Sequence, residues 1–275
     1  MVFSLLSFLF LPNFSFAQNR DSIFPAKTSQ PVNGSMQTKT PFGISDETQF
    51  EKFMPLVAGI GVTSKELLSE QSLKSYMMPP RKSGINGGTS SSYALASALE
   101  FYINMNNNYK DNLSPDYIRV GSNKTSIEDG LSFLCNNGTI SAAIMPYDVS
   151  TIPSAVYAAQ KYRIRNYLKL FQPSTRGLQK VYELRKAIMR GNPVIVEMQI
   201  TNGFKNLQSA RYWKPEEGDK TSAGSQYLIA VGYDEERKAI EFLNCWGREW
   251  GNGGYIWVSY DDFGEKGVNG FVLIP

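Results

Sequence analysis

Short apolar runs separated by glycine and aspartate turns fill the second half of the chain. The first of these runs, residues 194–198, is rich in β-branched side chains and follows a helical pattern over residues 181–190. Runs of this length between turn residues predict strands. Further strands are predicted for residues 227–233, 239–244, 255–259 and 270–274.

The first half of the chain has a helical pattern instead. Residues 93–102 carry small or apolar side chains on nearly every side, which is typical of a helix buried in a core. Ser114-Pro115 and Ser126 each precede a further helical pattern, because serine caps a helix and proline fits its first position. A helical half followed by an antiparallel half predicts an α+β fold.

The first 17 residues resemble a secretory signal peptide. Residues 2–16 are mostly apolar, and the small residues Ser15 and Ala17 fit the positions before a cleavage site. The run is too short to span a membrane, which takes about 20 residues. We therefore expect residues 1–17 to be removed, the mature chain to begin near Gln18, and the protein to be exported to the periplasm or the outside of the cell.

Residues 18–77 are interpreted as a leader. The part up to residue 43 is polar and lacks periodicity, and two short helices are predicted after it. One is opened by Ser45-Asp46-Glu47-Thr48, and the other by Thr63-Ser64-Lys65-Glu66, which has the form of a capping box. Whether this propeptide-like leader is cleaved, or covers a cleft, stays open at this point.

Charge and residue counts exclude several classes of function. The net charge of +3 comes from 28 basic and 25 acidic residues spread along the chain, so no nucleic-acid footprint is expected. Only Cys135 and Cys245 are present, and there is no histidine. Two cysteines do not make a disulfide scaffold, and without histidine they do not make an ordinary zinc site. We expect two free thiols, no metal and no cofactor.

Seven short motifs occur in a fixed order between residues 78 and 275. They are Pro79-Pro80, Ala98-Leu99-Glu100, Leu113-Ser114-Pro115, Met145-Pro146-Tyr147, Gly191-Asn192-Pro193-Val194, Ala230-Val231-Gly232-Tyr233 and the segment 244–255 with Trp246 and Trp250. Together they resemble the papain-like cysteine peptidases, in particular the bacterial branch without the usual disulfides. The resemblance implies two lobes, one helical over residues 78–165 and one β-rich over residues 166–275. It also implies a cleft that suits extended peptides.

The resemblance also assigns active-site positions. The cysteine that attacks the substrate corresponds to Ser90, the glutamine of the oxyanion hole to Gly84, and the histidine to Gln226. The orienting asparagine is kept as Asn244. A register shifted by two residues puts Ser92 at the cysteine position, with Tyr93 as the aromatic residue after it, and fits the helix less well.

The side chains beside Asn244 have less specific roles. Cys245 follows it, where the family commonly has serine. The family uses its two tryptophans to shield the asparagine from water, and here Trp246 and Trp250 are expected to remain as packing beside the cleft.

These replacements lead to the expectation that the chain is not an enzyme. A thiol or hydroxyl nucleophile needs a positioned base, and the amide of Gln226 does not accept a proton near neutral pH. Gly84 also lacks a side-chain donor for the oxyanion hole. We therefore expect an exported papain-like pseudopeptidase that acts by binding a protein or peptide, with an accessory subunit of a bacterial envelope assembly as one candidate role.

Two alternatives remain open from the sequence. One is a hydrolase that uses a substituted nucleophile, either Ser90 or Cys245. Glu249 or Lys82 could then activate Ser90 as a base, although no sequence spacing supports either residue. The other is a structural subunit whose cleft is filled by its own residues, either 44–76 or the loop 211–224.

Overall fold

The computed structural model describes residues 42–83, 90–107, 109–123, 126–215 and 222–275. The predicted signal peptide and the first part of the leader therefore lie outside the described residues.

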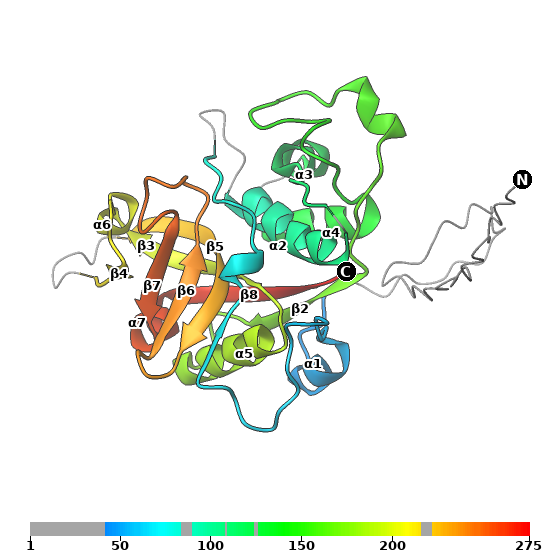
Figure 1. Ribbon diagram of the computed structural model, residues 1–275. Coiled ribbons are helices and arrows are strands. Elements are labelled where there is room, and N and C mark those ends of the chain that lie inside the picture. Colours follow the sequence, from blue (N-terminus) through cyan, green and yellow to red (C-terminus); the bar gives the residue numbers. More distant parts are fainter. Residues whose placement is uncertain (1–41, 84–89, 108, 124–125, 216–221) are drawn as a thin grey trace, which may run out of the picture. The chain divides into compact units, whose positions relative to one another are not determined.

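Figure 1 shows the helices and strands of the described part. The helices are α1 (Glu47–Phe53), α2 (Ser90–Asn106), α3 (Pro115–Ser122), α4 (Ile127–Asn136), α5 (Gly177–Met189), α6 (Asn202–Lys205) and α7 (Tyr260–Lys266), with 3-10 turns η1 (Lys74–Tyr76) and η2 (Ser154–Ala158). The strands are β1 (Glu70–Ser72), β2 (Asn166–Phe171), β3 (Val194–Thr201), β4 (Tyr212–Trp213), β5 (Ser222–Asp234), β6 (Ala239–Leu243), β7 (Tyr255–Ser259) and β8 (Gly267–Ile274).

One sheet joins all of these strands. Its order is β2-β8-β3-β5-β6-β7-β4, and β1 pairs with β5 outside this path. Every pairing is antiparallel except that of the two-residue strand β4 with β7. The prediction of an α+β fold, with helices first and an antiparallel-rich sheet afterwards, is confirmed.

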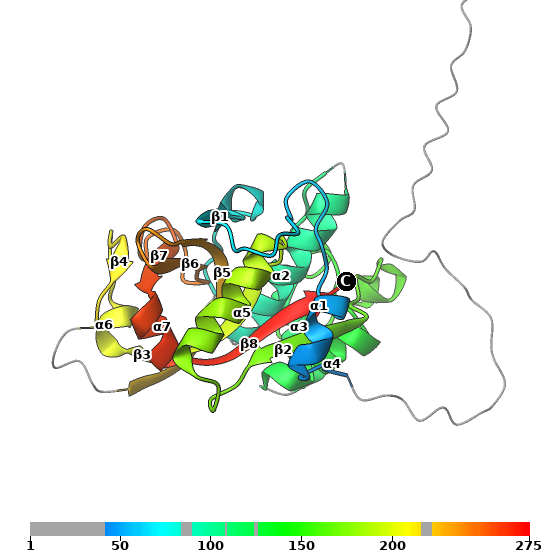
Figure 2. The same cartoon turned by 90° about the horizontal axis from the view of Figure 1, so that it is seen from below.

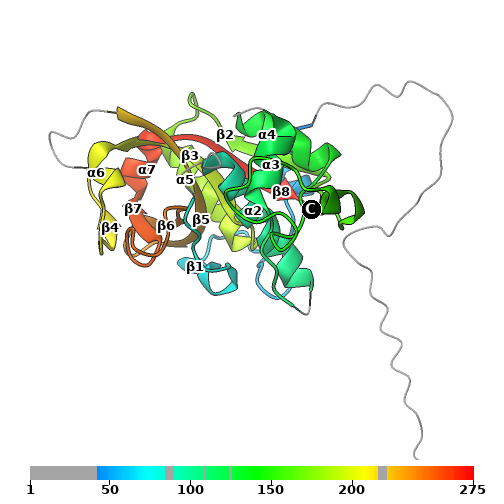
Figure 3. The same cartoon turned by 90° about the horizontal axis from the view of Figure 1, so that it is seen from above.

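Helices cover the sheet from two sides. Helix α2, with α3 and α4, lies over the sheet in the view from above (Figure 3), whereas α5 crosses it in the view from below (Figure 2). Helix α2 packs on β5 and β3, and α5 packs on β5, β2 and β8. The all-round apolar pattern of α2 is explained by this position, since Leu95, Ala96, Ala98 and Leu99 are all almost fully buried.

The predicted helix starts follow from local capping. Ser114 caps α3 by accepting a hydrogen bond from the backbone N–H of Tyr117, and Pro115 is the first residue of that helix. Ser126 caps α4 in the same way, from the N–H of Asp129. None of the helices in the described part of the chain is long and apolar enough to cross a membrane.

The second helix predicted for the leader is wrong. At its expected start, the Ser64 hydroxyl accepts a hydrogen bond from the N–H of Glu66, but the chain only turns there and then enters strand β1. The reason is tertiary, because Gln71 pairs with Tyr233 along the edge of β5. Pairing with an open strand edge satisfies backbone groups that a short isolated helix would leave at its ends. The first predicted helix is present as α1, capped by Asp46.

The described part of the leader packs on the body of the protein. The N–H of Val57 donates to the carbonyl of Arg190, and the Asn192 amide donates to the carbonyl of Pro55 at 2.7 Å. Nearer the start, the N–H of Gly43 donates to the Asn166 side chain. These contacts place residues 42–62 against α5 and β2.

Candidate functional site

Ser90 is the first residue of the 17-residue helix α2 and lies against strand β5. Its hydroxyl accepts a hydrogen bond of 3.2 Å from the backbone N–H of Tyr227. Ser90 is half-buried, whereas Ser92, two residues further along the helix, is buried. The helix therefore presents Ser90 at its N-terminus, where the helix dipole favours developing negative charge.

Gln226 and Asn244 lie directly beside this contact. The side-chain amide of Gln226 donates to the side-chain carbonyl of Asn244 at 2.8 Å, and both residues are buried. The same Asn244 oxygen accepts a hydrogen bond from the N–H of Cys245. Because Gln226 precedes Tyr227 on β5, the structure brings together Ser90, Gln226 and Asn244. Gly84, the fourth predicted position, lies outside the described residues.

Cys245 is held next to this group as a neutral thiol. Burial raises its pKa to about 11, and hydrogen bonds from Gln226 and Ser83 lower it only in part. The Gln226 amide lies 3.5 Å from the sulfur. A reactive cysteine needs a lowered pKa, so Cys245 does not have the electrostatics of an attacking thiolate. Cys135 is also free of any disulfide.

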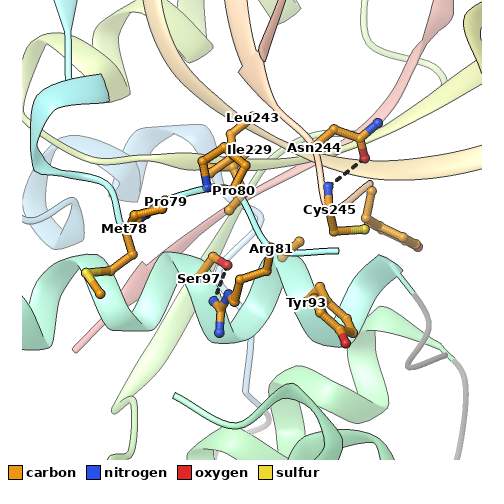
Figure 4. Close-up of a pocket in the computed structure, with 12 residues that line it drawn as sticks. Met78, Pro79, Pro80, Arg81, Tyr93, Ser97, Ile229, Leu243, Asn244 and Cys245 are labelled. Carbon is orange, nitrogen blue, oxygen red and sulfur yellow. Dashed lines mark hydrogen bonds between the residues drawn. The ribbon is translucent and has the colours of Figure 1, made fainter. Parts of the chain in front are cut away.

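A pocket opens between α2 and the segment that ends at Cys245. Figure 4 shows Tyr93 and Ser97 of α2 on one side, Asn244 and Cys245 on the other, and Arg81 between them. The pocket is lined by Met78, Pro79, Pro80, Arg81, Tyr93, Ala94, Ser97, Tyr227, Ile229, Leu243, Asn244 and Cys245. None of the described residues 44–76 lines it, and neither do the described residues of the loop 211–224.

Arg81 anchors the wall of this pocket to helix α2. Its guanidinium lies 3.2 Å from the carboxylate of Glu100 and donates to the hydroxyls of Ser97 and Tyr147. It also donates to the carbonyl of Leu113. The backbone carbonyl of Arg81 accepts a hydrogen bond from the N–H of Gly247, which follows Trp246. The sequence analysis did not predict this network.

Glu100 is buried beneath the pocket. Burial raises its pKa to about 7, against the opposing effect of Arg81 and of a hydrogen bond from the N–H of Leu113. The charges of Glu100 and Arg81 therefore interact where little solvent screens them.

An aromatic cluster supports the strand pair beyond Cys245. The ring of Phe204, on α6, lies within 6.0 Å of the rings of Trp213, Trp246 and Trp250, measured between centroids. The indole N–H of Trp250 donates to the carbonyl of Phe204 at 2.9 Å. Trp246 and Trp250 were expected here from the sequence, whereas Phe204 and Trp213 were not. The described residues contain no group of three or more potential metal ligands.

Comparison with known proteins shows which family the chain is similar to. The model of the papain family cysteine proteases matches residues 68–275. Cysteine proteinase 3 of Solanum lycopersicum is 37% identical over 77 residues, which are 27% of this chain and 22% of that protein. Peptidase 1 of Euroglyphus maynei is 21% identical over 231 residues, which are 82% of this chain and 68% of that protein. The chain thus spans only about a fifth of the tomato relative but two thirds of the mite one.

Solved structures show the same fold. Xylellain, a cysteine protease from Xylella fastidiosa, superposes with a TM-score of 0.60 at 21% identity, covering 81% of this chain and 94% of the other. A digestive procathepsin L 3 of Tenebrio molitor larval midgut superposes with a TM-score of 0.62 at 16% identity, covering 83% of this chain and 78% of the other.

These matches overturn one prediction made from the sequence. The expectation that the chain is not an enzyme is wrong, because the family model that matches residues 68–275 describes cysteine proteases, as do the names of the similar proteins. The missing imidazole excludes the thiol–imidazole pair, but it does not exclude a different nucleophile and proton acceptor. The resemblance to papain-like peptidases is confirmed: the chain belongs to the papain family of cysteine proteases.

Proposed function

We propose that this protein recognises polypeptides in an extended conformation, and that they bind in the pocket between α2 and the strands β5 and β6. The observation that carries the proposal is the geometry at Ser90. The start of α2, the Gln226–Asn244 pair and the pocket lined by Tyr93 and Cys245 meet at one place. Concave sites with a few fixed polar groups are the usual binding sites of proteins.

The surroundings of the pocket support this proposal. Arg81, Asn244 and Cys245 are each fixed by hydrogen bonds, so the walls are organised before a ligand arrives. The described residues of the leader pack on α5, β2 and β5 instead of lining the pocket. That placement counts against a cleft filled by residues 44–76.

Peptide binding in this pocket is tested with a bulky substitution at Ser90. Ser90→Tyr puts a large ring at the half-buried start of α2, and overpacking of this kind costs 1–3 kcal/mol. We expect affinity for a library of fluorescein-labelled decapeptides, measured by anisotropy, to fall by roughly tenfold or more. Ser154→Tyr, at an exposed serine near η2, is the matched control and should leave binding unchanged. Equal binding by both variants would place the peptide site elsewhere.

A second candidate is hydrolysis of the bound polypeptide with the Ser90 hydroxyl as nucleophile. Its position at the N-terminus of α2 favours this candidate. The Ser90 oxygen would form an ester with the substrate carbonyl while the amine leaves with the hydroxyl proton, and water would then release the acid. The proton needs an acceptor other than imidazole. Lys82 and Glu249, whose charged atoms lie 3.9 Å apart, are exposed candidates, and Lys82 forms a β-bridge with Trp246.

The chemistry is tested with a fluorophosphonate probe, which reacts with activated serine hydroxyls. We expect labelling of the native protein at Ser90 and loss of labelling in Ser90→Ala, with Ser154→Ala as a control that keeps it. Mass spectrometry of the labelled peptide identifies the residue. Labelling that persists in Ser90→Ala rules out Ser90 as the nucleophile.

Export and a place in a bacterial envelope assembly complete the proposal. They are supported by the apolar segment 2–16 and by the small residues Ser15 and Ala17 before Gln18. Residues 1–17 would be the signal peptide, residues 18–77 a leader and residues 78–275 the papain-like domain. Affinity purification from membrane and periplasmic fractions tests this part, and recovery only as an unprocessed free monomer would contradict it.

A further inference from the structure

The leader is anchored to the body of the protein over residues 43–62. Phe50 of α1 and Met54 at its end are 1% and 2% exposed, so both side chains belong to the core. Helix α1 itself packs on β2. The N–H of Val62 donates to the carbonyl of Met189 at the end of α5. This stretch is therefore held by buried apolar side chains and by backbone hydrogen bonds.

Asn192 connects the anchored stretch with both halves of the fold. Its side chain is fully buried, and its amide donates to the carbonyl of Pro55 at 2.7 Å. Its side-chain oxygen accepts a hydrogen bond of 2.9 Å from the hydroxyl of Tyr102 on α2. Removal of residues 43–62 would take an acceptor away from this buried amide, and a buried donor without a partner is costly. The rest of the protein is therefore built to keep these residues.

The next four residues, 63–66, are held differently. All four are exposed, and the chain forms neither helix nor strand there. The N–H of Glu66 donates to the hydroxyl of Ser64, two residues earlier. Among the described residues, no backbone group of this segment bonds to another part of the protein. An exposed segment of this kind opens at little cost and is a preferred site of proteolytic cleavage.

After this exposed segment the chain is anchored again. Strand β1 pairs with β5, and the N–H of Leu73, which is fully buried, donates to the carbonyl of Val231. Lys74 then forms an ion pair with Glu241 on β6. Residues 63–66 thus join two anchored stretches, and a cut between them would leave each stretch with its own contacts.

We propose that residues 63–66 are the site at which a processing protease cleaves the leader, and that residues 43–62 stay bound afterwards as a light chain. Hydrolysis of the bond after Lys65 or after Glu66 consumes one water and creates a carboxylate and an amino group, both at an exposed place where water solvates them. The light chain is then a permanent part of the protein and not a removable inhibitor of the pocket. This inference goes beyond the proposed function and does not depend on it.

The cleavage site is tested by limited proteolysis of the full chain with two enzymes. Trypsin should cut after Lys65 and a glutamyl endopeptidase after Glu66, and intact-mass spectrometry identifies both cuts. Glu51 and Lys52 provide an internal comparison, because they are also exposed but lie in α1. The helix has to open before a protease can bind these residues, so we expect cleavage after them to be at least roughly tenfold slower.

Retention of the light chain is tested on the cleaved protein by size-exclusion chromatography. At roughly 10 µM, more than about nine-tenths of the fragment that ends at Lys65 should elute with the body, which corresponds to a Kd of about 0.1 µM or lower. Urea should separate the two chains. Affinity for the labelled decapeptides should stay within about twofold of its value before cleavage, because residues 43–62 do not line the pocket.

Three variants separate the two parts of the proposal. Lys65→Ser should abolish the cut by trypsin in this segment and leave the cut after Glu66, whereas Lys52→Ser should change neither. Phe50→Ala should leave the cuts in place but raise the Kd of the light chain by roughly a hundredfold or more, because it removes a buried ring.

The unaltered protein decides the matter even where a variant does not fold. Bonds after Lys65 and Glu66 that stay intact until α1 is cut overturn the cleavage site. Release of the fragment from the cleaved protein without urea overturns the light chain, and so does a gain in peptide affinity of more than about tenfold on cleavage. Failure of every peptide to bind overturns only the proposed function, since cleavage and retention are measured without a peptide.

Discussion

Replacing Arg81 with methionine is expected to lower the free energy of unfolding by about 3–5 kcal/mol, because it leaves the buried carboxylate of Glu100 without its cation. The guanidinium lies 3.2 Å from that carboxylate, and the two side chains are 9% and 2% exposed. It also satisfies the carbonyl of Leu113 and the hydroxyl of Tyr147, which would lose a donor. Equilibrium unfolding in urea at pH 8 measures the change.

The adjacent residue provides a matched control. Lys82→Met removes the same charge, but Lys82 is 73% exposed and its partner Glu249 is 92% exposed, so this pair is worth at most about 1 kcal/mol. The double variant Arg81→Met with Glu100→Gln should regain part of the loss, since no buried charge is then left unpaired. A cost for Arg81→Met no greater than that for Lys82→Met would contradict the assigned role.

Arg81→Met is expected to affect the pocket as well as the stability of the protein. Residues 81–83 are bonded to the segment after Asn244, through Gly247 to Arg81 and through Ser83 to Cys245. Arg81 ties this pair of segments to α2, which carries Ser90. Loss of its side chain is therefore expected to loosen one wall of the pocket, so that peptide binding weakens even where the variant stays folded.

Much of the fold could be predicted because its signals are local. Serine caps fixed the starts of α3 and α4, and the β-branched run at 194–198 identified β3. The failed helix at residues 63–73 shows the limit of such signals. A capping box gives information only about the backbone turn in which it lies. The part of β5 that pairs with residues 70–72 lies some 160 residues away in the chain.

The site divides in the same way. Ser90, Gln226 and Asn244 could be placed by counting from sequence landmarks, and the structure brings them together. Arg81 and Phe204 could not, because their importance comes from contacts that no motif records. The ion pair of Arg81 reaches 19 residues along the chain, and the carbonyl of Phe204 accepts from an indole 46 residues away.

The stability of the protein is expected to depend on pH through Glu100. Burial raises the pKa of this carboxyl group from 4.5 to about 7 in the folded protein, so folding takes up a proton between these two values. The stabilising contribution is complete below pH 4.5 and is lost as the pH rises through 7. A difference of this size corresponds to about 3 kcal/mol.

The contribution is isolated by comparing Glu100→Gln with the unaltered protein. Urea unfolding is measured from pH 4.5 to pH 8.5, and the difference between the two proteins should shift by up to about 3 kcal/mol in favour of the variant as the pH rises. Glu183→Gln is the comparison at a second buried carboxyl group, whose pKa is lowered in part by Lys186 and by a hydrogen bond from Gln179. Burial also raises the pKa of that carboxyl group, but it has no arginine partner among the described residues. Parallel pH profiles for Glu100→Gln and the unaltered protein would contradict the prediction.

The two predictions constrain each other. Arg81 lowers the pKa of Glu100, so its removal moves that pKa further above 7 and keeps the carboxyl group protonated to higher pH. A neutral Glu100 needs no cation, so Arg81→Met should cost less at pH 5, where only its bonds to Leu113, Tyr147 and Ser97 are lost. The full cost is reached only where Glu100 is ionised in the unaltered protein, above pH 7. A cost that does not change with pH would mean that Arg81 stabilises the pocket wall through its bonds to Leu113 and Tyr147, and not through the ion pair.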